Sequence, residues 1–87
     1  MKRQEFKLRL DTPASYRIRL QGVLGKSWSD RMGGMDIVVD HEAGMAPVTT
    51  LTGQLIDQAA LYGVINAVYD LGYPLLSVEC LDEKVNG

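Results

Sequence analysis

The sequence of 87 residues is poor in the side chains on which most catalytic and metal-binding sites depend. It has one cysteine, Cys80, and one histidine, His41. A single cysteine excludes an internal disulfide framework and a thiolate zinc cluster, so we expect a reducing compartment, the cytoplasm. No nucleophile or second positioned group stands at a defined spacing from His41, which we expect to be an exposed strand-end residue. We predict no catalytic residue, no cofactor and no metal, and we lean against an enzyme.

Long apolar runs are also missing. The basic start MKRQEF is not followed by the apolar core of a signal peptide, and no run approaches the length that spans a bilayer. We therefore expect neither export nor insertion into a membrane.

A complete phosphate-binding loop is missing as well. Gly25, Lys26 and Ser27 look like the end of one, but Leu20 stands where the pattern requires its first glycine. We expect Lys26 to be a solvated turn residue.

What is present is ordinary globular composition, with 46% apolar and 23% charged residues. This length indicates one domain that buries only about 60% of its extended-chain surface, so a partner that adds buried area would stabilise it. We predict a basic strand or arm over residues 1–14, a single α+β domain over 15–82 and a tail over 83–87.

Charge is unevenly distributed behind the net charge of −2. Six basic and two acidic residues precede Gln21, whereas nine of the eleven acidic residues follow Leu20. A basic front end can bind nucleic acid, but a sheet that reads RNA carries paired aromatics and belongs to a basic domain. Because this domain is acidic and Tyr16 falls with the core set, we expect the basic residues to pair with the acidic remainder and consider nucleic acid unlikely.

Alternation of apolar and polar residues predicts several strands. The predicted strands are 6–10, 16–20, 35–42, 48–52 and 75–81, the first being either an extra strand or a flexible arm. Gly44 can take a positive φ, so 35–42 and 48–52 form a predicted hairpin. In the last strand, Leu76, Val78 and Cys80 are expected to point inward.

The clearest helix signals lie between Asp57 and Gly72. Asp57 is a good N-cap, and Ile56 and Leu61 are spaced as a hydrophobic staple. Gly72 is the expected left-handed terminator, and Pro74 prevents continuation. One apolar stripe recurs at helical spacing: Leu61, Val64, Ile65, Val68 and Leu71.

A shorter helical turn is expected after Gly25. Ser27 and Asp30 are spaced as a capping box, and Gly33 with Gly34 ends the turn. Trp28 is expected to close one end of the core.

The resulting order is strand, short helix, strand, strand, long helix, strand. It favours a small ferredoxin-like α+β sandwich, with a mainly antiparallel four-stranded sheet, one long helix and a vestigial first helix. A three-stranded meander followed by a helix and a strand is the alternative.

The outer side of the long helix is unusual because Asp70 is its only charge from Gln58 to Leu71. A freely solvated helix usually carries Lys and Glu there, whereas glycine costs about 1 kcal/mol relative to alanine. We therefore predict that this side is covered, by the same chain or by a second copy. The predicted interface, which we call the helix back, comprises Ala59, Tyr62, Gly63, Asn66, Ala67 and Tyr69.

Charged residues also alternate on the predicted sheet. Arg17 and Arg19 share one strand face, and Asp36, Asp40 and Glu42 share another. We expect cross-strand pairing between the two sets rather than a cation site. If the arginines were unpaired, Arg17 and Arg19 would form an anion-binding site.

Two segments resemble a group of small, uncharacterised prokaryotic proteins. LTGQLIDQAALYGVINAVYDLGYPLLSV is similar to LTGxxxDQAALHGLLxxIRDLGLPLLSV, and SYRIRLQGVLGKSWSDRMGGMDI is similar to YxIxVxGxLxxxWSxWFxGL. The resemblance covers most of the chain from Ser15 to Val78. Tyr62 stands where that group has histidine, and Arg31-Met32 replaces an aromatic pair after Trp28. The resemblance implies a compact cytoplasmic domain and carries no activity with it.

These observations favour a non-enzymatic interaction module that forms a homodimer through the helix back or a sheet edge. The alternative is a regulatory domain that binds a small anionic ligand on the sheet face at Arg17 and Arg19.

Overall fold

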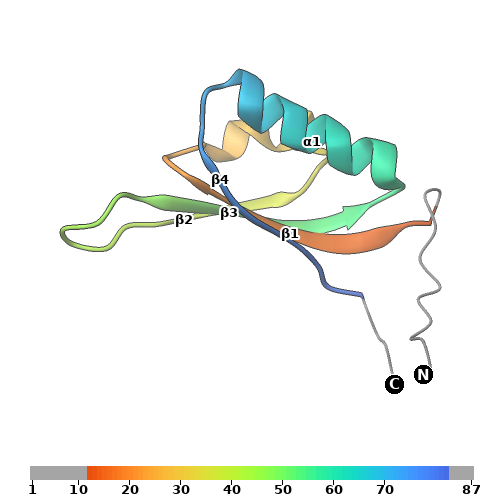
Figure 1. Cartoon of the computed structure of the whole chain (residues 1–87), viewed down its shortest axis with the longest axis horizontal. Coiled ribbons are helices and arrows are strands. Elements are labelled where there is room, and N and C mark those ends of the chain that lie inside the picture. The colour runs from red at the N-terminus through yellow and green to blue at the C-terminus, as the bar shows by residue number, and fades with distance from the viewer. Residues whose placement is uncertain (1–11, 83–87) are drawn as a thin grey trace, which may run out of the picture.

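A computed structural model describes residues 12–82, which form four strands and two helices (Figure 1). In chain order they are β1 (Ala14–Gln21), the 3-10 helix η1 (Lys26–Met32), β2 (Asp36–Asp40), β3 (Val48–Leu55), α1 (Gln58–Asp70) and β4 (Leu75–Cys80). The strand predicted over 6–10 and the tail over 83–87 lie outside the described residues.

The four strands form one open sheet in the order β2-β3-β1-β4, and every neighbouring pair is antiparallel. Both helices lie on one face of this sheet (Figure 1). The expected α+β class, four-stranded antiparallel sheet and single main helix are thereby confirmed. The meander is excluded, because β1 pairs with β3 and β4 rather than with β2.

Alternation along β1 divides the sheet into a core face and an open face. Ala14, Tyr16, Ile18 and Leu20 are buried, while the residues between them are partly exposed. As expected, Tyr16 belongs to the core, and its hydroxyl accepts a hydrogen bond from Gln58 Nε2 at 3.3 Å.

The predicted hairpin is confirmed, because β2 pairs with β3 from Asp36↔Thr52 to Asp40↔Val48. Gly44 turns the chain with φ +77°. Strand β3 continues to Leu55, three residues beyond its predicted end, because β1 pairs with its whole length, including the last three residues that extend past β2.

The ends of α1 follow the predicted signals. Asp57 Oδ1 accepts from the Ala60 N–H at 2.8 Å, and Gly72 has φ +87°. The Gly72 and Tyr73 N–H groups donate to carbonyls of the last helical turn at 2.9 and 3.2 Å, which forms a Schellman motif. Ile56 is 69% exposed, so the expected staple buries little of it.

The predicted capping box on η1 is wrong. This helix begins after Gly25 and has no side-chain cap, while the Ser29 hydroxyl donates to the Met35 carbonyl at 2.8 Å. Gly33 ends η1 in the left-handed region, as expected. Trp28 is partly buried against the core, and the Arg31 guanidinium lies 5.3 Å from its ring centroid.

Candidate interaction surface

An apolar surface extends along one flank of α1 and onto the helix side of β4. We call it the α1–β4 surface, and it comprises Tyr62, Ile65, Tyr69, Leu75, Leu76 and Val78. Tyr62 and Tyr69 are 59% and 79% exposed. Tyr62, Ile65 and Tyr69 recur at intervals of three and four, so they share one stripe of the helix.

Position in the sheet explains why this surface is open. Val78 is directly opposite Ile18, so it lies on the core face of the sheet. Nevertheless, Leu76 and Val78 are 49% and 38% exposed, and β4 is an edge strand with a neighbour on one side only among residues 12–82. Val78 therefore points to the core face, as predicted, but neither Leu76 nor Val78 is buried, whereas Cys80 is partly buried against the core.

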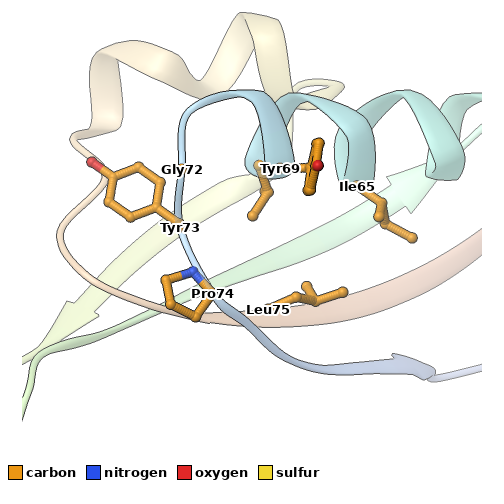
Figure 2. Close-up of a pocket in the computed structure, with 7 residues that line it drawn as sticks. Ile65, Tyr69, Gly72, Tyr73, Pro74 and Leu75 are labelled. Carbon is orange, nitrogen blue, oxygen red and sulfur yellow. The ribbon is translucent and has the colours of Figure 1, made fainter.

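A groove of about 370 Å³ lies at the end of this surface next to the C-terminus of α1 (Figure 2). Its lining, which is mainly apolar, comprises Ile65, Val68, Tyr69, Gly72, Tyr73, Pro74 and Leu75. Figure 2 shows the helix above the groove and the start of β4 below it. The Tyr73 hydroxyl donates to the Val23 carbonyl at 2.8 Å, which holds one wall in place.

The six residues of the predicted helix back lie in different environments in the structure. Ala59, Gly63 and Asn66 are exposed, and no described residue covers this side. Ala67 is partly buried and packs against the core. Of the six predicted residues, Tyr62 and Tyr69 lie on the flank that faces β4 and belong to the α1–β4 surface.

The outer edge of β4, the one that faces away from β1, adds backbone groups to the apolar side chains. The Leu81 N–H donates to the Ser15 carbonyl at 2.8 Å, so the Leu81 amide points towards β1. Because antiparallel strands direct successive residues alternately to either side, the N–H and C=O of Val78 and Cys80 point away from the sheet. Within residues 12–82, no strand lies beyond β4.

The open face of the sheet carries Arg17 and Arg19, but the prediction that they pair with the acidic residues of β2 is wrong. Strand β3 separates β1 from β2, so Arg17 and Arg19 do not neighbour the acidic residues Asp36 and Asp40. Glu42 is exposed beyond the end of β2. Instead, Arg17 Nη1 lies 2.9 Å from Glu79 Oε1, in a partly exposed ion pair.

Arg19 differs from Arg17, because it has no ion pair within the described part of the chain. It is directly opposite Ser77 on β4 and Thr50 on β3. The Ser77 hydroxyl is buried and has no hydrogen-bond partner among the residues that the structure covers.

The remaining candidates are dispersed. His41 is exposed immediately after β2, as expected, and Lys26 is exposed at the start of η1. Across residues 12–82 no group of three or more His, Cys, Asp or Glu side chains is placed to hold a metal ion. None of the helices in this range is long and apolar enough to cross a membrane.

Sequence reasoning missed the flank formed by α1 and β4, because hydrophobic periodicity cannot show which strand is left at an edge. One available signal was the consecutive pair Leu75-Leu76, which breaks strict alternation. In the structure the pairing of β1 with β4 shifts register between Arg19 and Leu20, opposite this pair.

Comparison with protein families matches residues 15–79 to a family described as a domain of unknown function, DUF8691. No curated protein and no solved structure matches the chain.

Proposed function

This chain belongs to the DUF8691 family, and we propose that it is a non-enzymatic interaction module that associates with a second copy of itself. The observation that supports this proposal is the α1–β4 surface, where large apolar side chains lie next to a strand edge that no other strand of residues 12–82 pairs with.

Burial of this surface is favourable for two reasons. Exposed apolar area is the main driving force for association, and patches of this kind often mark interaction sites. Tyrosines are enriched at interfaces because each offers a large contact area and a hydroxyl for the rim. Tyr62 and Tyr69 lie about two helical turns apart on the same side of α1, so both can contact one partner surface.

Analytical ultracentrifugation of matched variants tests the proposal. We expect the wild-type chain to be a dimer at tens of micromolar. Tyr69→Arg should shift the mass to that of the monomer, because it places a charge in the contact. Gly63→Arg adds the same charge on the helix back, where a side chain meets open space, and should leave the dimer intact.

The outcomes separate the two possible surfaces. A wild-type monomer at these concentrations refutes self-association. A dimer that is lost with Gly63→Arg but retained with Tyr69→Arg places the contact on the helix back instead.

Arg19 supports a second candidate function, the binding of a small anionic ligand on the open sheet face. Its guanidinium is unpaired within residues 12–82 and lies opposite the Ser77 hydroxyl, which lacks a hydrogen-bond partner there. A guanidinium and a hydroxyl together suit a phosphate or carboxylate group. Arg17 is less suitable, because Glu79 already neutralises it.

A thermal-shift panel of phosphorylated and carboxylated metabolites tests this candidate. We expect stabilisation that Arg19→Gln abolishes and Arg17→Gln largely retains. A flat profile for the wild-type protein refutes it.

We further propose that the domain is ferredoxin-like and works in the cytoplasm of a prokaryote. The element order and the sheet order β2-β3-β1-β4 support the fold assignment. The single cysteine and the resemblance to small prokaryotic proteins support the location and the source.

A further inference from the structure

The two edges of the sheet differ in how they are protected against pairing. Edge strand β2 carries Asp36 and Asp40, and charges of this kind discourage an added strand. Edge strand β4 carries a single charge, Glu79, which is already paired with Arg17. The unprotected edge is therefore the one beside the α1–β4 surface.

We propose that β4 pairs antiparallel with β4 of a second copy about a two-fold axis at Val78, so that the two sheets form one continuous sheet. This inference rests on the proposed self-association and specifies its geometry. A pairing of β4 with itself closes after two copies, whereas a pairing of β4 with β2 is heterologous and would build a larger ring or a fibre.

Backbone directions restrict the possible registers. The outward N–H and C=O of Val78 meet their counterparts in the copy when the axis passes through this residue. Cys80 then faces Leu76 of the second copy. With the axis at Ser77, Cys80 would face Pro74, which has no N–H to donate.

Side chains favour the same register. With the axis at Val78, each Ser77 lies opposite Glu79 of the other copy, so its buried hydroxyl gains a carboxylate acceptor. With the axis at Glu79, two carboxylates would face each other, which is unfavourable. On the helix side, Val78 of each copy then extends the α1–β4 surface of the other.

Cysteine cross-linking of the full chain tests this register. In a Cys80→Ser background, Val78→Cys places two thiols directly opposite at a Cα separation of about 5.5 Å, within disulfide range. The matched variant Ser77→Cys places its thiols diagonally, about 7–8 Å apart, near or beyond that range. We expect mild oxidation to cross-link Val78→Cys several-fold more than Ser77→Cys.

A separate variant covers the case in which Val78→Cys fails to fold. Val78→Lys places a charge on the axis and should give a folded monomer by circular dichroism and sedimentation. A dimer that survives Val78→Lys overturns the inference.

Failure of the β4 register can be distinguished from failure of self-association. A wild-type dimer without the Val78→Cys cross-link, or with stronger cross-linking at Ser77→Cys, overturns the β4 register and leaves self-association standing. A wild-type monomer overturns both. A monomer in which the Val78→Cys thiol resists a maleimide reagent indicates that the same chain covers this edge, which also overturns the inference.

Discussion

Thr49 is the one buried polar residue in residues 12–82, and its replacement gives a sharp test of the packing. Its hydroxyl donates to the Gly22 carbonyl at 2.6 Å and accepts from the Leu24 N–H at 3.1 Å. It therefore fixes the segment that leads from β1 to η1. Thr49→Val keeps the shape of the side chain but leaves both backbone groups without this partner.

The expected loss follows from the cost of unsatisfied groups. A buried donor or acceptor left unpaired costs about 1–3 kcal/mol, so we expect Thr49→Val to lower the free energy of unfolding by about 2–4 kcal/mol. Thr49→Ser retains the hydroxyl and loses one methyl group, which should cost about 1 kcal/mol.

Urea denaturation at one fixed protein concentration measures both variants. With a slope near 1 kcal/mol per molar, the midpoint should fall by about 2 M or more for Thr49→Val and by about 1 M for Thr49→Ser. A valine variant as stable as the serine variant would refute the assigned role of the hydroxyl.

Other predictions concern helix ends and surface charge. Gly33→Ala should lower the free energy of unfolding by about 2–4 kcal/mol, because its φ is +69° and the new Cβ would lie 2.6 Å from the core residue Leu55. Gly34→Ala has a similar φ but meets open space, so it should lower this free energy by about 1–2 kcal/mol. Equal losses for the two variants in urea denaturation contradict the packing argument. Asp57→Ala should lower the thermal midpoint by removing about 1 kcal/mol of N-cap stabilisation, and an unchanged midpoint contradicts the cap. A double-mutant cycle of Arg17→Met and Glu79→Gln should give a coupling below about 1 kcal/mol, since the pair is partly exposed; a larger value indicates a drier site.

Features that depend on a few adjacent residues could be predicted from the sequence. Asp57 and Gly72 mark the ends of α1 because each acts on backbone groups within one helical turn. The same reasoning gave a wrong start for the short helix η1. A capping box assumes an α-helix that starts at Ser27, whereas the Trp28 N–H donates to the Gly25 carbonyl at 3.0 Å and the turn starts earlier.

Features that depend on strand order could not be predicted in the same way. Alternation placed Arg17 on the open face but could not show that Glu79, rather than Asp36, would be its neighbour. Likewise, the partners of the Thr49 hydroxyl lie 25 and 27 residues away in sequence. A β-branched strand residue gives no local indication of such distant contacts.

The candidate surface was predicted in part. The lack of charge on the outer side of α1 placed Tyr62 and Tyr69 in the predicted interface, and both side chains are exposed in the structure. The rest of the helix back was grouped with them because helical periodicity shows which side of the helix a residue is on, but not which strand lies beside it. Only the position of β4 shows that these tyrosines border a second set of apolar side chains.

Sedimentation velocity of the full wild-type chain, from low to high micromolar concentration, is the most direct test of self-association through the α1–β4 surface. We predict a concentration-dependent shift to twice the mass of the chain, which Tyr69→Arg abolishes. A single species of monomer mass at every concentration would contradict the account.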